Sequence, residues 1–152
     1  MRRAKIYTFI GMVVLGLCFS SLAETTEEKE AAALAAAKTW LALVDDGQYG
    51  ESWETAAAYF KSTVTKDYWQ HALPAIRKMF GEPISRKLGS ITYTQSLPGS
   101  PDGEYVVIEI ATSFEQKKHA VETVIPMLDN DGEWRVSGKR RLGEEHRCKW
   151  QD

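Results

Sequence analysis

The sequence is poor in cysteine, and its histidines lack the spacing of a metal site. Its only cysteines are Cys18 and Cys148, and Cys18 lies in an apolar N-terminal segment. Without that segment a single thiol is left and no internal disulfide forms, so Cys148 is interpreted as an incidental thiol, with pairing between chains as the alternative. His71, His119 and His146 are far apart and do not form the paired pattern of zinc ligands. Because phosphate-cradling glycine patterns and nucleophile elbows are also missing, we expect no metal and no cofactor.

A strong excess of charge of one sign is also lacking. The formal net charge is −2, and loss of the three cations of the leader would leave −5. A mildly acidic protein gains little from neutralising phosphates, so the composition argues against nucleic acid and anionic membranes as partners. The basic run over residues 139–141 is interrupted by Glu144 and Glu145, which favours a solvated tail over a binding patch.

The chain has one long hydrophobic run, and it lies at the start. Residues 1–23 begin with three cations, continue with a mostly apolar stretch over 6–22, and end with the small residues Ser21 and Ala23. This layout is typical of a secretory signal peptide that is cut after Ala23. The stretch is at the short edge of what spans a bilayer, so an uncleaved anchor is the alternative. We expect a periplasmic or secreted protein that has no membrane contact after cleavage.

Helical periodicity fills the first part of the mature chain. It predicts three helices, over Thr25–Asp45, Tyr49–Lys61 and Thr65–Phe80. The first has the spacing of a capping box, and its expected buried stripe is Ala33, Ala37, Trp40, Leu41 and Val44. The third has an expected stripe of Trp69, Leu73, Ile76, Met79 and Phe80, and Pro74 should bend or split it.

After Pro83 the period changes from helical to alternating. Strands are expected over Ser90–Leu97, Glu104–Phe114, Ala120–Leu128 and Glu133–Ser137. Asp129–Gly132 resembles the start of a calcium loop but lacks the distal glutamate, so we interpret it as a hairpin turn. Helices followed by antiparallel strands predict an α+β fold, with three N-terminal helices packed on a curved antiparallel sheet of about four strands. The predicted organisation is a signal peptide over 1–23, one domain over 24–138 and a polar tail over 139–152.

The order of these elements and several short motifs resemble a family of short exported bacterial proteins of unknown function. The residues that carry the resemblance are Trp40, Asp45-Asp46-Gly47-Gln48-Tyr49, Ser52-Trp53, Trp69, Gly81, Ser85-Arg86, Tyr105-Val106-Val107, Thr112-Ser113-Phe114, Glu122 and Gly132-Glu133-Trp134-Arg135-Val136. The match covers about residues 31–138. It implies a cone-shaped domain of the nuclear transport factor two-like, cystatin-like type, and it implies no reaction.

Acid–base candidates are few. Asp67 and His71 are four residues apart and share a helix face, so the carboxylate is a candidate to orient the imidazole as a general base. Glu109 lies among apolar residues on the strongest strand, where a concave location would raise its pKa. The simpler interpretation is a helix-start aspartate, a surface histidine and a solvated strand face.

Aromatic residues are the main pocket candidates. Trp40, Trp53, Trp69 and Tyr93 either line an apolar ligand pocket or form the core of a helix-on-sheet fold. We also expect Arg86 and Arg135 to tie the sheet to Asp45 or Asp46 through ion pairs.

Three hypotheses follow. The preferred one is a non-catalytic module that binds a small apolar ligand or a protein partner. The second is a small acid–base enzyme of the isomerase or dehydratase kind, using Asp67, His71 or Glu109. The third is a homodimeric assembly module that associates through the outer sheet face.

Overall fold

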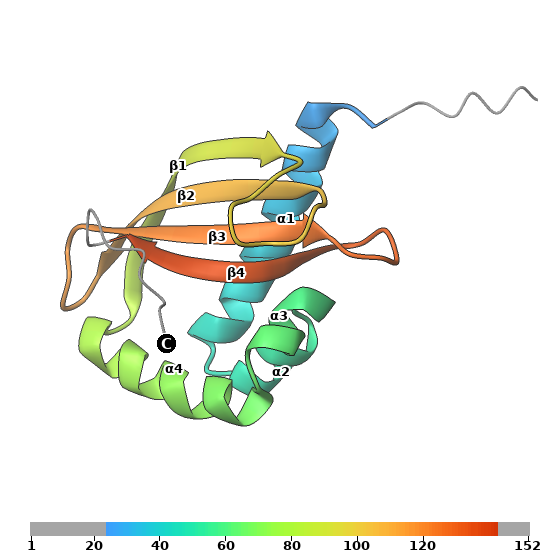
Figure 1. Ribbon diagram of the computed structural model, residues 1–152. Coiled ribbons are helices and arrows are strands. Elements are labelled where there is room, and N and C mark those ends of the chain that lie inside the picture. The colour runs from blue at the N-terminus through green and yellow to red at the C-terminus, as the bar shows by residue number, and fades with distance from the viewer. Residues whose placement is uncertain (1–23, 143–152) are drawn as a thin grey trace, which may run out of the picture.

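A computed structural model describes residues 24–142 of the chain, as four helices followed by four strands (Figure 1). The helices are α1 (Thr26–Asp45), α2 (Tyr49–Glu54), α3 (Ala58–Thr63) and α4 (Lys66–Phe80). The strands are β1 (Pro83–Thr94), β2 (Tyr105–Phe114), β3 (Ala120–Leu128) and β4 (Trp134–Leu142). They form one open antiparallel sheet in the order β1-β2-β3-β4. The predicted α+β class is confirmed.

The first helix, α1, crosses one face of the sheet and contacts all four strands (Figure 1). Its buried residues are Ala33, Ala37, Trp40, Leu41 and Val44, as the periodicity predicted. The capping box between Thr25 and Glu28 is present, and Gly47 adopts the left-handed backbone expected where the helix ends. Because alanines form part of this stripe, the helix backbone approaches the sheet closely.

The helix predicted over Tyr49–Lys61 is in fact two short helices, so the expected number of three is wrong. The chain becomes extended at Ala57, whose N–H donates to the Val136 carbonyl on β4 at 2.9 Å. The next N–H, of Ala58, donates to the Asp129 carboxylate at 2.9 Å. These two bonds to the sheet edge replace the intrahelical bonds that would have joined α2 to α3.

The last helix, α4, runs unbroken from Lys66 to Phe80, so Pro74 does not split it. Met79 was expected in its buried stripe but is 68% exposed, while Trp69 and Leu73 are buried. The buried stripe is narrower than predicted, because Ile76 and Phe80 in the C-terminal half pack against the fold but are only partly buried. No helix within residues 24–142 is both long and apolar enough to cross a membrane.

The strands confirm the alternation but differ in their ends. The first begins at Pro83 and stops at Thr94, which is earlier on both sides than the predicted Ser90–Leu97. The last extends to Leu142 instead of ending at Ser137. Both extra segments have polar sequences, and pairing with β2 and β3 holds them in the sheet.

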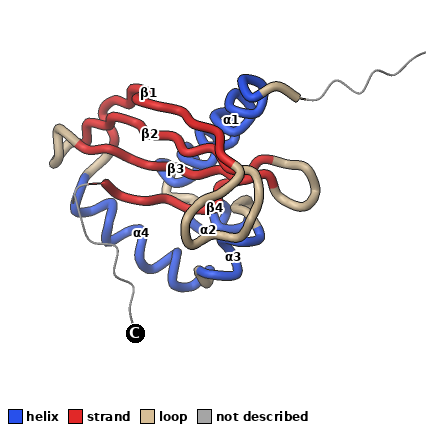
Figure 2. Tube along the Cα trace, turned by 45° about the horizontal axis from the view of Figure 1, so that its top comes forward, coloured by secondary structure: helices blue, strands red, loops and turns tan. Residues whose placement is uncertain are grey.

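The two faces of the sheet are covered by different parts of the chain. On the inner face, Val106, Ile108 and Ile110 of β2 are buried beneath α1. On the outer face, the loop between β1 and β2 folds over one end of the strands, as Figures 1 and 2 show. Tyr105 is fully buried under this loop, and its hydroxyl donates to the Pro101 carbonyl at 2.7 Å. The opposite end of the outer face, beside the turn between β2 and β3, is not covered by this loop.

Candidate functional site

Two of the predicted pocket aromatics meet in the core. The rings of Trp40 and Trp69 have centroids 5.7 Å apart, and Phe60 packs edge-on to Trp69. Both indole nitrogens donate to Ser52, Trp40 to its carbonyl at 2.7 Å and Trp69 to its hydroxyl at 3.0 Å. Ser52 is fully buried. This arrangement satisfies the buried donors and joins α1, α2 and α4. These two tryptophans are therefore part of the hydrophobic core.

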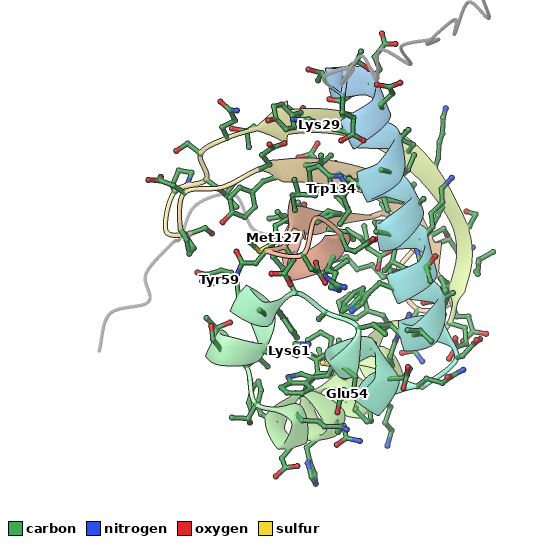
Figure 3. The ribbon with its side chains drawn as sticks, turned by 90° about the vertical axis from the view of Figure 1, so that its right-hand side faces the viewer. Lys29, Glu54, Tyr59, Lys61, Met127 and Trp134 are labelled. Atoms are coloured by element: carbon green, nitrogen blue, oxygen red, sulfur yellow. The ribbon has the colours of Figure 1, made fainter. Side chains whose placement is uncertain are left out.

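The other two pocket aromatics lie at separate places. The indole of Trp53 donates to the Val64 carbonyl at 2.7 Å, and the Lys61 ammonium lies over its ring. Tyr93 lies beside the N-terminal part of α1, where Lys29 sits 5.0 Å from its ring centroid. Figure 3 shows Lys29 and Lys61 far apart on the two ends of this side of the molecule. The four residues therefore do not line a common pocket.

The acid–base candidates do not converge either. His71 Nδ1 is 2.7 Å from the backbone carbonyl of Asp67, to which it donates, and both residues are exposed on α4. The Asp67 carboxylate therefore does not orient the ring. Glu109 faces outward from β2, half-buried, and accepts a hydrogen bond from the Ser90 hydroxyl at 3.0 Å. Nothing in this geometry couples a proton donor to an acceptor across an enclosed space.

The acidic turn between β3 and β4 is a hairpin, as predicted. The Gly132 N–H donates to the Asp129 carbonyl at 2.9 Å, and Gly132 has a positive φ. Arg135 contacts the carboxylates of Asp131 at 2.6 Å and Asp129 at 3.7 Å, so the expected tie from Arg135 to Asp45 or Asp46 is wrong. Both acids precede Arg135 by only a few residues in the same hairpin, so these local contacts replace the expected distant one. Within residues 24–142 no cluster of three or more His, Cys, Asp or Glu residues is placed to hold a metal.

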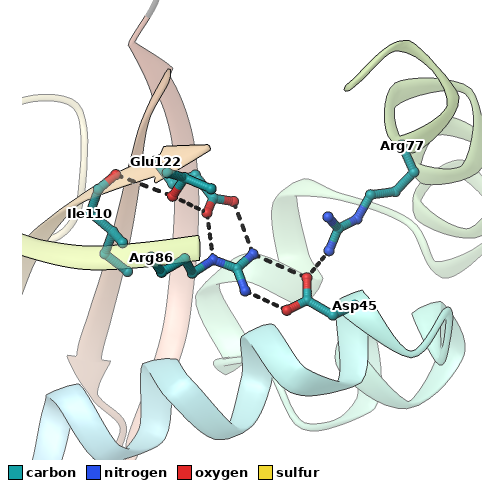
Figure 4. A network of polar contacts seen from close by, with 6 residues as sticks. Asp45, Arg77, Arg86, Ile110 and Glu122 are labelled. Atoms are coloured by element: carbon teal, nitrogen blue, oxygen red, sulfur yellow. Dashed lines mark hydrogen bonds and ion pairs between the residues drawn. The ribbon is translucent and has the colours of Figure 1, made fainter. Parts of the chain in front are cut away.

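The expected pair between Arg86 and Asp45 is confirmed, and it belongs to a larger network (Figure 4). Arg86 also donates to Glu122 at 2.7 Å, and Arg77 of α4 pairs with the same Asp45 carboxylate. Thr112 donates its hydroxyl to Glu122 at 2.7 Å. Arg77 and Arg86 thus pair with Asp45 and Glu122 where α1, α4 and three strands meet.

Arg86 keeps its charge in this network. Burial disfavours the charged form of the Arg86 guanidinium, but hydrogen bonds to Asp45 and Glu122 more than offset this and raise its pKa. Sequence reasoning found Asp45 and Arg86 and missed Arg77 and Thr112. A cation in the last turn of a helix is common, and nothing in the local pattern of Arg77 signals a distant partner.

A groove lies on the open end of the outer sheet face, with a volume of about 490 Å³. It is lined by Ser85, Lys87, Ala111, Thr112, Ser113, Lys117, Lys118, His119, Ala120 and Val121. The register places Lys87, Ala111 and Val121 side by side on β1, β2 and β3. Because the middle strand carries short side chains here, its surface is the floor and its neighbours are the walls.

The groove walls are basic. Lys87 rises from β1, while Lys117, Lys118 and His119 come from the turn between β2 and β3, and no acidic residue is in the lining. In the described part of the chain none of these lysines forms an ion pair, although Lys117 lies over the Phe80 ring at 5.5 Å. The sequence analysis treated residues 116–119 as a polar turn only. The signal that would have revealed the groove is the combination of Ala111 and Ser113 on one strand face with three cations in the segments beside it.

Comparison with known proteins gives a family and nothing finer. No curated protein and no solved structure matches the chain. A family model described as a protein of unknown function (DUF4019) matches residues 36–139, which include the second half of α1, the charged network and the groove. The chain therefore belongs to the DUF4019 family of proteins of unknown function.

Proposed function

We propose that this protein is an exported, non-catalytic binding module. The observation that carries the proposal is the different use of the two sheet faces. The inner face, where related cone folds keep a reactive pocket, is filled here by Trp40, Trp69 and the apolar residues of β2. Open space with polar walls lies on the outer face instead. A groove of about 490 Å³ is within the usual range for a small-molecule site.

The export half of the proposal rests on the N-terminal pattern. Cations, an apolar stretch and small residues before the cut are what a signal peptidase substrate needs. The cap of α1 is Thr25, so removal of residues 1–23 would leave intact every helix and strand that the structure describes within residues 24–142. Residues 1–23 lie outside the described part of the chain, and their role stays a prediction.

The proposed fold type is the nuclear transport factor two-like cone. It is supported by the order of elements, in which N-terminal helices precede an antiparallel meander, and by α1 crossing one face of the sheet. The partly covered outer face is the surface that a dimer would use, and Val121 at its open end is 38% exposed. A ligand in the groove and a second copy over the same strands would exclude each other.

Native mass spectrometry of the protein from a periplasmic extract tests the proposal. The expected result is a chain that begins at Glu24, with a retained small molecule or a mass shift on addition of a ligand. A chain that keeps residues 1–23 and stays in the cytoplasmic fraction would overturn export. Turnover of a carbonyl or hydroxy-acid substrate that is abolished by His71→Asn would overturn the non-catalytic role, because His71 is not among the residues that line the groove. A dimer mass would favour the assembly hypothesis.

A further inference from the structure

From the groove walls, we infer that this protein binds a small polyanion, a molecule with at least two phosphate or carboxylate groups, between Lys87 on one side and Lys117, Lys118 and His119 on the other. The inference rests on the proposed binding role and names its ligand class. It replaces the apolar ligand expected from the aromatic residues, because those residues are in the core or at separate places.

The groove gathers several lysines that form no ion pair. Elsewhere in the described part of the chain, five cations are paired with carboxylates, namely Lys29, Lys66, Arg77, Arg86 and Arg135. The other lysines there without an ion pair, Lys38, Lys61 and Lys78, come from three different helices. The mature chain is acidic overall, so a cluster of unpaired lysines is a local departure from its composition. Like charges that share a groove repel each other, and a bound anion would relieve that repulsion.

The shape of the groove suits a compact ligand. Its floor contains Ala111 and Ser113, whose side chains are short, so an anionic group can approach the sheet surface between the lysines. Hydroxyl groups of Ser85 and Ser113 add neutral hydrogen-bond donors to the ammonium groups of the walls. Lysine acts as a mobile point charge toward phosphate, which fits a site that is open to solvent.

The backbone of β1 is shaped at the same place. Its register against β2 shifts once between Pro83 and Ser85 and again between Leu88 and Ser90. Such bulges increase the local twist of a strand and redirect its side chains, and they are frequent next to binding sites. Ser85 and Lys87 lie between the two shifts. The strand segment that forms one wall of the groove therefore has an irregularity at each end.

Titration calorimetry of the mature protein with inorganic pyrophosphate tests this inference. We expect binding at low salt that weakens as salt rises, because the contacts are exposed charges. The double variant Lys117→Gln/Lys118→Gln should weaken binding by about tenfold, the scale of losing charge-assisted hydrogen bonds. The matched control is Lys38→Gln/Lys78→Gln, which removes the same charge from α1 and α4 and should change the affinity by less than about twofold.

Three results would overturn the inference. They are the absence of pyrophosphate and citrate binding at low salt, an equal loss of affinity in the groove variant and in the control, and binding to phosphatidylglycerol vesicles without binding to soluble pyrophosphate. The last would assign the lysines to a lipid surface. A non-anionic small molecule retained in native mass spectra, together with failed pyrophosphate binding, would reject the polyanion and leave the binding role standing.

Discussion

The two faces of one strand show how differently this sheet is used. Val106, Ile108 and Ile110 of β2 point inward and are buried beneath α1. Ala111 and Ser113, the next outward-facing positions, are small and form the floor of a basic groove. The strict alternation of a strand assigns adjacent residues to opposite tasks. Inward positions are therefore constrained by packing, whereas the outward positions Ala111 and Ser113, which the loop between β1 and β2 does not cover, are available for recognition.

Polar groups follow the same division. On the inner side, the charges of Arg86, Arg77, Asp45 and Glu122 are paired within the fold. On the outer side, Lys87 and its neighbours across the groove form no ion pair in the described residues. Paired charges that are shielded from water hold elements together, while unpaired exposed charges are available to a ligand. The predictions below test whether the two faces are as separate as this comparison implies.

The largest effect is expected from Trp40→Ala on the inner face. It removes the ring contact with Trp69 and the hydrogen bond to Ser52, and it leaves a cavity between α1 and the sheet. We expect a loss of about 3–5 kcal/mol in the free energy of unfolding, measured by urea denaturation followed by circular dichroism. A loss below about 1 kcal/mol would mean that α1 is not anchored here. Trp40→Phe keeps most of the apolar volume and is the matched control.

Arg86→Met should have the second largest effect, about 2–4 kcal/mol in the free energy of unfolding. It removes the cation from two carboxylates, and the Glu122 side chain is only 6% exposed. The side chains of Arg86 and Asp45 are more exposed, which keeps the loss at the lower part of the range for buried pairs.

The double variant Arg86→Met/Glu122→Gln sharpens that measurement. It removes the carboxylate charge together with its cation, and the amide oxygen still accepts from Thr112. We expect its loss in the free energy of unfolding to be smaller than the sum of the losses in Arg86→Met and Glu122→Gln, by about 1 kcal/mol or more. Additive losses would show that the two side chains do not interact in solution.

Features of the fold that depend on residues close together in the sequence were predictable, whereas features that depend on distant residues were not. The buried stripe of α1 and the alternation of β2 follow from periodicity, and both are confirmed. The break at Ala57 was not predictable, because its cause is a hydrogen bond to Val136, a residue far away in the sequence. The exposure of Met79 likewise depends on how α4 packs against the rest of the fold, which a helical period does not encode.

The sites show the same limit. Arg86 and Asp45 were paired from their charges alone. Arg135 lies only four positions after Asp131, and that local pair replaced the expected distant one. The groove requires three strands in register, so only the sheet reveals that Lys87, Ala111 and the lysines of the turn between β2 and β3 line one groove. A sequence shows which residues share a strand face. It does not show what the neighbouring strand brings beside them.

The same substitution on each face tests the comparison directly. Ala37→Leu adds bulk where α1 meets the sheet and the alanine is fully buried, so overpacking should lower the free energy of unfolding by about 1–3 kcal/mol. Ala111→Leu adds the same bulk to the exposed floor of the groove and should change stability by less than about 0.5 kcal/mol. Urea denaturation measures both. Ala111→Leu should also weaken pyrophosphate binding, whereas Ala37→Leu should leave it unchanged in the folded protein. Equal destabilisation by the two variants would end the distinction between the faces.

The smallest expected effect concerns the acid stability that the pair between Lys29 and Glu104 provides at the start of α1. The hydrogen bond from Lys29 holds the pKa of Glu104 below its usual value of 4.5. A carboxylate with a lowered folded-state pKa adds stability above its unfolded pKa, and this contribution disappears as the pH falls through the folded value. Glu104→Gln should therefore be slightly less stable than the wild type at pH 7, and the difference should vanish at a pH well below 4.5. Glu54→Gln, whose pair with Lys66 is more exposed, is the control and should show a weaker dependence. A difference that stays constant down to the acid limb would assign the stabilisation to packing of the Glu104 side chain and not to its charge.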